Sequence, residues 1–261
     1  MGKKKNVTKQ KEECDNLQTE SESLDQQKRA ATRSIINLLN KFTLTEKQKE
    51  LLKIINDNKL IIIIGPAGVS KTFSICYYIT ELIAKHSLDF KQFILTKPIQ
   101  ESGEKLGFLP GDVNEKIGPY FESYVSNFEQ MMPPVEFKKL LEKKKISYEP
   151  LAYMRGRSFN SSVTVLDEGQ NANWKQIMLF VTRMGRGSKV IIAGDVSQHD
   201  IDKDMLALTG FANMVKDLPG VAVFNFERED IMRDPILIEI TDRYEQLKYS
   251  GQIKEEKNGK Y

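Results

Sequence analysis

The feature that most constrains this 261-residue chain is a glycine-rich segment directly after a short apolar run. The run Leu60–Ile64 is rich in β-branched residues and is followed by turn residues, which is typical of a buried strand in a parallel sheet. Residues 65–72 then read GPAGVSKT and match the pattern G-x-x-x-x-G-K-[ST] at every fixed position except residue 70. Such a loop opens a helix and presents backbone N–H groups to an anion. The sequence therefore predicts a phosphate-binding loop, the P-loop, between a strand and a helix.

The P-loop residues have predicted tasks in binding a nucleoside triphosphate. Gly65 and Gly68 permit tight turns and close approach of the backbone to phosphate. Lys71 is expected to reach the β- and γ-phosphates, and the hydroxyl of Thr72 to coordinate Mg²⁺. The predicted nucleotide-binding residues of this segment are Gly65, Pro66, Ala67, Gly68, Val69, Ser70, Lys71, Thr72 and Phe73. Because Ser70 adds a Cβ and a hydroxyl where the pattern has Gly, we expect weakened or slowed nucleotide handling.

Composition is that of an ordinary globular protein, with 40% hydrophobic and 29% charged residues. The length fits one large domain or, less easily, two small ones. A net charge of +3 is too small to identify a nucleic-acid partner, and two cysteines exclude a disulfide framework. No apolar run approaches the roughly 20 residues of a membrane span. We therefore expect no membrane partner and a cytoplasmic location.

The chain divides into three regions by composition. Residues 1–32 are rich in Lys, Glu, Gln and Ser and are predicted to be a polar tail, disordered or helical. Residues 33–250 are predicted to form the nucleotide-binding domain, and residues 251–261 a second polar tail. Within the domain, strand-like and helix-like segments alternate, and one helix begins at the capping pattern of residues 45–48. This alternation predicts an α/β fold with a mainly parallel sheet and helices on both faces.

A second motif lies at the end of another apolar strand, residues 163–166, which is followed by Asp167 and Glu168. Ligands of open parallel sheets bind at the carboxyl ends of the strands. We predict that Asp167 holds Mg²⁺ and that Glu168 polarises the attacking water. A solvated strand end is the simpler interpretation of such a run alone, but its position downstream of the P-loop favours the functional one.

Further candidates carry weaker local signals. The strand 190–193 leads to Asp195 and Gln198, which are predicted to sense the γ-phosphate, although an ordinary strand-to-loop turn explains them almost as well. Gln48 lies upstream of the P-loop, where an amide could read adenine, but locally a solvent-facing position explains it better. Arginines that could contact phosphate are Arg155, Arg157, Arg183, Arg186, Arg228 and Arg233. Local pattern singles out none of them.

Taken together, these residues resemble the PhoH family, the phosphate-starvation-inducible ATPases. The resemblance covers roughly residues 45–248, and its segments are 65–68 (GPAG), 103–112 (GEKLGFLPGD), 150–157 (PLAYMRGR), 166–170 (LDEGQ) and 194–198 (GDVSQ). Two positions depart from the family pattern, Ser70 and Gly169, where Ala is more usual. The Lys-, Ile- and Asn-rich composition and the short length would suit a bacteriophage-encoded member.

The resemblance implies a RecA-like P-loop ATPase core, close to the first motor domain of superfamily one helicases. In that frame Gln48 matches the adenine-reading glutamine, and Asp195 with Gln198 matches the third helicase motif. Arg228 and Arg233 are similar to the late arginines that act on a neighbouring subunit's nucleotide. The resemblance also implies a homo-oligomeric ring, a hexamer, with RNA or single-stranded DNA as partner.

Three functions remain open from the sequence. The leading hypothesis is a motor subunit that uses Mg²⁺ and hydrolyses ATP to ADP and phosphate. Because a two-domain helicase does not fit in this length, strand translocation would require a ring or would be absent. The alternative is a nucleotide-switched nucleic-acid-binding protein with little turnover. A nucleoside or metabolite kinase is a third idea, against which the lack of a lid-like arginine cluster counts.

Overall fold

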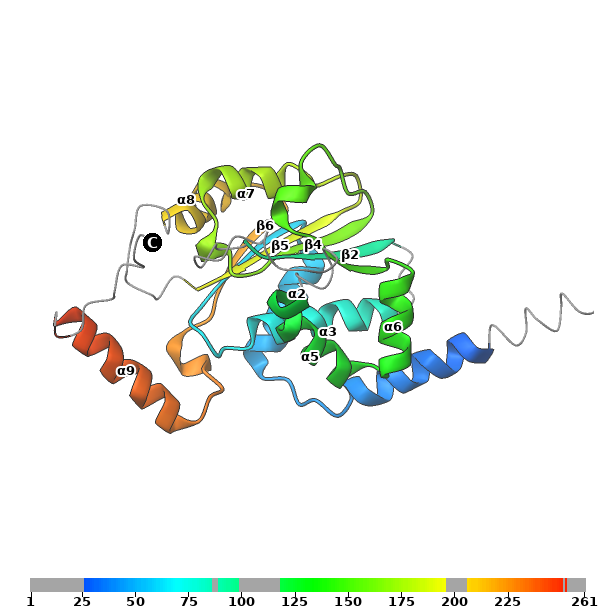
Figure 1. Ribbon diagram of the computed structural model, residues 1–261, viewed down its shortest axis with the longest axis horizontal. Coiled ribbons are helices and arrows are strands. Elements are labelled where there is room, and N and C mark those ends of the chain that lie inside the picture. Colours follow the sequence, from blue (N-terminus) through cyan, green and yellow to red (C-terminus); the bar gives the residue numbers. More distant parts are fainter. Residues whose placement is uncertain (1–25, 86–88, 99–117, 196–205, 251, 253–261) are drawn as a thin grey trace, which may run out of the picture.

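The computed structural model describes residues 26–85, 89–98, 118–195, 206–250 and 252 (Figure 1). Its strands are β1 (Leu60–Ile64), β2 (Gln92–Thr96), β3 (Ile146–Tyr148), β4 (Ser162–Leu166), β5 (Lys189–Gly194) and β6 (Val221–Asn225). Its main helices are α2 (Glu46–Asp57), α3 (Lys71–Ala84), α5 (Glu122–Met131), α6 (Pro134–Glu142), α7 (Trp174–Val181), α8 (Leu206–Val215) and α9 (Pro235–Tyr249), and residues 26–39 form a further helix. Most of the two predicted tails and the segment 103–112 lie outside the described ranges.

The six strands form one parallel sheet in the order β3-β2-β4-β5-β1-β6. β1 lies between β5 and β6, with Ile62 opposite Ile192 and Val223. Strands covered on both faces are apolar along their whole length, which is why the run Leu60–Ile64 is so hydrophobic. The predicted parallel sheet is therefore confirmed.

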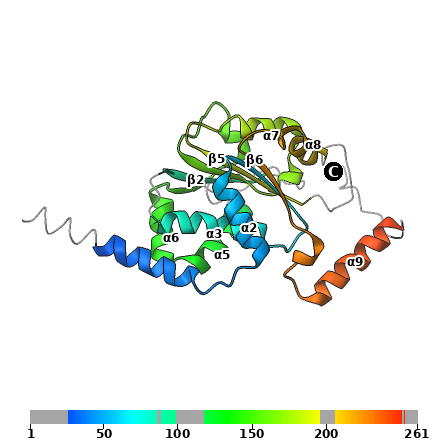
Figure 2. The ribbon, with the colours of Figure 1, turned by 180° about the vertical axis from the view of Figure 1, so that it is seen from behind.

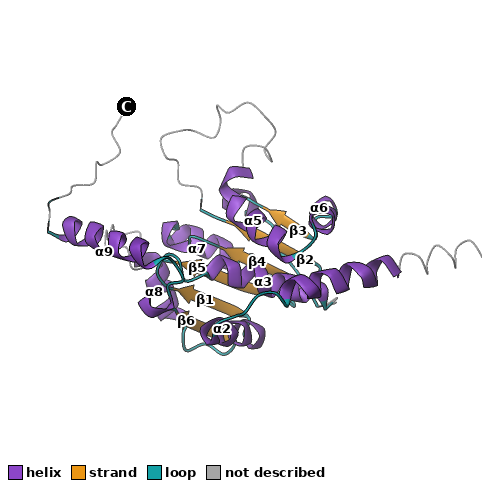
Figure 3. Cartoon of the chain, turned by 90° about the horizontal axis from the view of Figure 1, so that it is seen from below, coloured by secondary structure: helices purple, strands orange, loops and turns teal. Residues whose placement is uncertain are grey.

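Helices cover both faces of the sheet, as predicted (Figures 1 and 2). Alternate residues of β1 point to opposite faces, so Ile61 and Ile63 join one core while Leu60 and Ile62 join the other. The first core includes residues of α2, α3, α5, α6 and the helix at 26–39. The second is built with α7 and α8. The view from below looks onto the sheet and shows its strands side by side (Figure 3).

Local sequence signals explain how α2 is placed against the sheet. Its predicted capping box forms: Thr45 Oγ1 accepts from Gln48 N at 3.2 Å, and Gln48 Oε1 accepts from Thr45 N at 2.9 Å. At the other end of α2, Lys189 Nζ donates to the carbonyls of Ile55, Asn56 and Asn58. Burial lowers the pKa of Lys189 to about 8. The first residue of β5 thus satisfies orphan carbonyls at the end of α2.

Backbone chemistry sets the ends of two elements. α7 ends at Val181, because Arg183 N and Met184 N bond to carbonyls only three residues back. β3 ends at Tyr148, since Pro150 cannot donate to a ladder and begins a 3₁₀ turn.

The last helix, α9, stands away from the body of the molecule (Figures 1 and 2). Five large apolar side chains on α9 are exposed: Ile236, Leu237, Ile240, Tyr244 and Leu247. Within the described ranges, no helix combines the length and the apolar character needed to cross a bilayer.

Candidate nucleotide-binding site

The sheet order brings the three predicted motifs to one edge. β5 lies between β1, which leads into the P-loop, and β4, which leads to Asp167 and Glu168. Asp195 follows β5 directly and is buried. Because β5 is the middle strand of the three, Asp195 follows the strand between those that lead to the P-loop and to Asp167. Gly65 N donates to Gly194 O at 3.2 Å, which ties the start of the P-loop to the end of β5. Gln198 lies outside the described residues.

The side chains of Thr72 and Asp167 meet at the carboxyl edge. Thr72 Oγ1, in the first turn of α3, donates to Asp167 Oδ2 at 3.0 Å. Hydroxyl and carboxylate oxygens are hard ligands, and Mg²⁺ is commonly held by one or two protein oxygens together with phosphates and waters. Over the described ranges, no three His, Cys, Asp or Glu side chains gather as a larger metal site. Thr72 and Asp167 therefore fit the predicted metal-binding pair.

Lys71 is folded onto its own loop. Its Nζ donates to the carbonyls of Gly65 at 2.6 Å and Pro66 at 2.8 Å. Burial lowers the pKa of Lys71, and the nearby carboxylates of Asp195 and Asp167 oppose that shift. The ammonium is thus kept at the P-loop by weak neutral acceptors. Phosphate oxygens, which carry charge, are stronger partners for it.

The remaining P-loop residues are divided between backbone and packing roles. Val69 is buried, and Ala67 is exposed at the tip of the loop. The Phe73 ring packs edge-on against Phe42, with centroids 5.3 Å apart, so its side chain anchors α3. The backbone N–H of Phe73 belongs to the first turn of that helix, where such groups lack an intrahelical acceptor.

Ser70 adopts a backbone conformation that favours glycine. Its φ of 61° and ψ of 34° lie in the left-handed region, which disfavours residues with a Cβ by about 1–2 kcal/mol. This is the physical reason for Gly at that position of the pattern. The Ser70 hydroxyl donates to Val69 O at 2.6 Å and accepts from Gln48 Nε2 at 2.7 Å. Hydrogen bonds that glycine could not make therefore hold the strained residue.

Gln48 is buried, with 3% of its surface exposed, so the solvent-facing interpretation of this residue is wrong. Its amide oxygen accepts from Thr45 N, and its amide nitrogen donates to Ser70 Oγ and lies 3.6 Å from Met232 Sδ. Local sequence could not show this, because the burying contacts come from the P-loop and from the segment after β6. The structure thus joins a predicted adenine-reading residue to the unusual serine.

Glu168 is held at the strand end by a residue that sequence reasoning gave no separate role. Gln170 Nε2 donates to Glu168 Oε2 at 2.7 Å, and Gln170 Oε1 accepts from Asp195 N at 2.9 Å. Gln170 therefore connects the ends of β4 and β5. Glu168 is exposed and has a φ of 53°, a second strained position at this edge. Such strain concentrates at functional sites.

Tight packing behind the edge explains the departure at Gly169. A Cβ there would lie 2.9 Å from Ile192 Cγ2 and 3.1 Å from Ala193 O, so this neighbourhood leaves no room for alanine. At Gly194 a Cβ would meet Leu208 Cδ2 at 2.4 Å. Close approach of β5 and α8 thus selects glycine at both positions.

The two late arginines lie in different surroundings. Met232 N donates to Gly68 O at 3.1 Å, and this brings Arg233 over the P-loop of its own chain. A Cβ on Gly68 would lie only 2.8 Å from Arg233 Nε. Arg228 instead forms an ion pair with Asp242 of α9 at the surface. Arg157 pairs with Glu149 and stacks on Phe159, so this candidate serves packing in the described structure.

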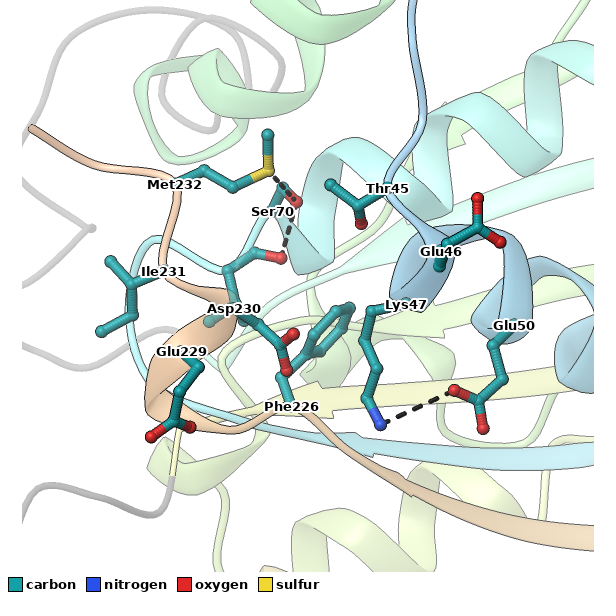
Figure 4. Close-up of a pocket in the computed structure, with 11 residues that line it drawn as sticks. Thr45, Glu46, Lys47, Glu50, Ser70, Phe226, Glu229, Asp230, Ile231 and Met232 are labelled. Carbon is teal, nitrogen blue, oxygen red and sulfur yellow. Dashed lines mark hydrogen bonds and ion pairs between the residues drawn. The ribbon is translucent and has the colours of Figure 1, made fainter.

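A cavity of about 500 Å³ opens beside the P-loop (Figure 4). Phe226, Ile231 and Met232 supply apolar surface from the segment after β6. The other lining residues are Thr45, Glu46, Lys47, Glu50, Val69, Ser70, Glu229 and Asp230. Three lining residues, Thr45, Ser70 and Met232, also contact the buried Gln48 amide. The cavity thus adjoins both the P-loop and the predicted base-reading residue.

The strand order, the P-loop and the Thr72–Asp167 contact define a P-loop NTPase with a RecA-like α/β core. The similarity to known proteins extends beyond the fold to the amino-acid sequence. The chain belongs to the family described as PhoH-like protein, whose profile matches residues 42–245.

Two curated relatives agree with this assignment. The chain is 38% identical over 205 residues to the PhoH-like protein of Bacillus subtilis (strain 168) and 32% identical over 194 residues to Protein PhoH of Escherichia coli (strain K12). The matches take in 77% and 73% of this chain but only 63% and 54% of those relatives. The crystal structure of the HK97 bacteriophage large terminase has a TM-score of 0.52 at 15% identity, over 85% of this chain and 52% of that one. At that identity the likeness concerns the fold alone.

The left-handed backbone at Ser70 generates a stability prediction. Ser70→Ala loses the hydroxyl and keeps the strain, whereas Ser70→Gly loses both. We expect the glycine variant to exceed the alanine variant in free energy of unfolding by about 1 kcal/mol, measured by urea denaturation without nucleotide. Ser70→Ala should also fall below the wild type by about 1 kcal/mol through the lost hydrogen bond. Equal stability of the two variants would contradict strain at this position.

Proposed function

We propose that this chain binds ATP together with Mg²⁺ and hydrolyses it to ADP and phosphate. The observation that carries the proposal is the 3.0 Å contact between Thr72 Oγ1 and Asp167 Oδ2, because it joins two oxygen ligands at the helix that begins with Lys71. Thr72 and Asp167 would hold Mg²⁺, which when bound would supply neutralisation of the charge that develops during phosphoryl transfer. Membership of the PhoH-like family supports the same assignment.

The chain's own residues supply positioning and proton handling. Lys71 exchanges the carbonyls of Gly65 and Pro66 for phosphate oxygens, which are stronger acceptors for an ammonium. Glu168 accepts a proton from the attacking water while Gln170 fixes its carboxylate. Gln170 also accepts a hydrogen bond from Asp195 N, so a movement of the backbone at the end of β5 would move the Gln170 side chain that holds the Glu168 carboxylate. Asp195 and Gln198 retain the predicted sensing role.

We propose that the cavity beside the P-loop receives the adenine base. Phe226, Ile231 and Met232 offer it apolar contact, and Gln48 lies behind the lining. Both polar groups of the Gln48 amide already have hydrogen-bond partners, so adenine must displace one of these partners to bind the amide. The Ser70 hydroxyl is the partner that competes with adenine. This competition supplies a mechanism for the slower nucleotide handling expected from Ser70.

The base pocket can be tested by comparing ligands with and without a base. Gln48→Ala should weaken ADP binding about tenfold, since one lost hydrogen bond and its reorganisation are worth about 1–2 kcal/mol, and should leave pyrophosphate binding unchanged. Calorimetric titration measures both affinities. Lys53→Ala, on the same helix and absent from the cavity lining, is the matched control. Equal loss for both ligands would indicate damage to the P-loop rather than loss of base recognition.

We further propose that the ATPase acts on RNA or single-stranded DNA as a ring-forming motor subunit. The family resemblance supports the partner, and the exposed apolar side chains of α9 are a surface that a subunit contact would cover. A nucleotide-switched binding protein with little turnover is the alternative. One observation favours it: Ser70 occupies a strained backbone conformation in the P-loop.

One paired ATPase experiment separates these functions. Glu168→Gln should lower kcat at least 100-fold, because general-base contributions are typically 10²–10⁴-fold, while ADP affinity stays within about twofold. Glu136→Gln, on α6 and paired with Lys139 away from the motifs, is the control. Single-stranded RNA should stimulate wild-type turnover several-fold. Unchanged turnover in Glu168→Gln would remove the proposed base, and ATP-dependent RNA affinity without stimulation would favour the switch.

The arginines predict different behaviour in mixed assemblies. Since Arg233 packs over the P-loop of its own chain, we propose that it acts on its own nucleotide, whereas exposed Arg228 acts on a neighbour's. Inactive Lys71→Ala mixed with Arg228→Ala should then recover part of the activity. Lys71→Ala mixed with Arg233→Ala should stay inactive. Recovery in the second mixture would show that Arg233 acts between subunits, and light scattering of each mixture verifies that an oligomer forms.

A further inference from the structure

A second lysine, Lys97, lies at the metal-binding edge and takes no part in the function proposed above. It follows β2, the neighbour of β4, and Asp167 N donates to Thr96 O at 3.0 Å. Because Thr96 pairs with Leu166, Lys97 and Asp167 are the first residues after the ends of two neighbouring strands. Lys97 Nζ lies 3.7 Å from Asp167 Oδ2, the oxygen that also accepts from Thr72. Both side chains are well covered, with 13% of Lys97 and 3% of Asp167 exposed.

The Lys97 ammonium is held by α5 as well as by the carboxylate. Its Nζ donates to Ser123 Oγ at 2.9 Å and lies 5.2 Å from the centre of the Tyr124 ring. A cation over an aromatic face is attracted by the ring, more strongly when desolvated. Three groups from two elements thus fix the charge. A lysine at the surface would lose side-chain entropy in such an arrangement and gain little.

The Tyr124 ring that lies under the ammonium belongs to a side chain that also faces Asp167. Burial, assisted by the negative charge of Asp167 and a hydrogen bond to that carboxylate, raises the pKa of Tyr124 well above its usual range, so the hydroxyl stays protonated and neutral. Lys97 and Tyr124 thus approach the same carboxylate, and only Lys97 brings a positive charge to it.

Charge balance decides what Lys97 does. Without metal, Asp167 is a buried carboxylate, which needs a counter-ion. Lys97 supplies that counter-ion. Once a divalent cation takes the same carboxylate oxygens, the ammonium and the metal repel each other across a short distance. The two cations therefore compete for Asp167.

We propose that Lys97 is a positioning residue that serves as an exchangeable counter-ion of Asp167 and thereby sets the affinity of the site for Mg²⁺. The inference rests on the proposed function, since it takes Asp167 as a metal ligand. Lys97 keeps the carboxylate oriented and neutralised before nucleotide arrives. It yields Asp167 when metal and phosphate oxygens arrive together, while Ser123 and Tyr124 retain its ammonium on α5.

The test compares Lys97→Gln, which removes the charge, with Lys97→Arg, which keeps it. Binding of a fluorescent ADP analogue is titrated with Mg²⁺, and also measured in EDTA. In Lys97→Gln the half-saturating Mg²⁺ concentration should fall about tenfold, because a charge at this distance changes a competing equilibrium by one or more powers of ten. Affinity in EDTA should stay within about twofold of the wild type, since the competition exists only when metal is present. Lys97→Arg should resemble the wild type.

Thermal unfolding gives an independent readout without turnover. Without nucleotide, Lys97→Gln should unfold at a lower temperature than the wild type, because Asp167 is left unpaired. Adding Asp167→Asn to that variant should restore the unfolding temperature, since the double variant buries no lone charge. A single variant no less stable than the wild type, or a double variant without recovery, would overturn the counter-ion role.

The outcomes also separate this inference from the proposed function. If ADP binding by the wild type is independent of Mg²⁺, the proposed metal site itself fails. If the wild type depends on Mg²⁺ and Asp167→Asn does not, while Lys97→Gln keeps the wild-type Mg²⁺ requirement, only the Lys97 inference fails. If Lys97→Gln weakens ADP binding equally in EDTA and in Mg²⁺, Lys97 is a phosphate ligand and the counter-ion role is wrong.

Discussion

The parallel pairing of β5 with both β1 and β4 is the constraint on which the site depends. Ile64 pairs with Gly194 in one ladder, and Leu166 pairs with Ile192 in the other. Parallel ladders align the carboxyl ends of their strands, so the P-loop, Asp195 and Asp167 lie at the same edge of the sheet. Glycine at 169 and 194 then lets α8 approach the same edge. Packing, rather than sequence proximity, thus assembles the residues that we assign to nucleotide binding.

Backbone strain occurs at two positions of that edge. Of the four non-glycine residues with positive φ in the described ranges, Ser70 and Glu168 belong to the site. Each is held by side-chain hydrogen bonds, Ser70 to Gln48 and Glu168 to Gln170. Strained residues persist where neighbours determine their conformation. The same contacts that stabilise the strain therefore orient the groups that we assign to base recognition and to activation of water.

Two lysines satisfy polar groups of the site. Lys71 occupies carbonyls of the P-loop, and Lys97 lies against the carboxylate that we assign to the metal. Each prevents a buried polar group from standing alone, which would be unfavourable in a site of low dielectric constant. The nucleotide and its metal would therefore exchange contacts at a site that is already shaped, rather than create one from open chain.

The sequence by itself determined the elements and the motifs. An apolar run before GPAGVSKT, a strand ending in Asp167 and Glu168, and a capping box at Thr45 are local patterns, and hydrophobic periodicity and turn chemistry suffice to identify them. Only the tertiary structure decided the contacts between Gln48 and Ser70, between Lys97 and Asp167, and between Arg233 and the P-loop. These pairs lie far apart in the chain. Their contact depends on strand order and on the path of the segment after β6, which no local pattern encodes.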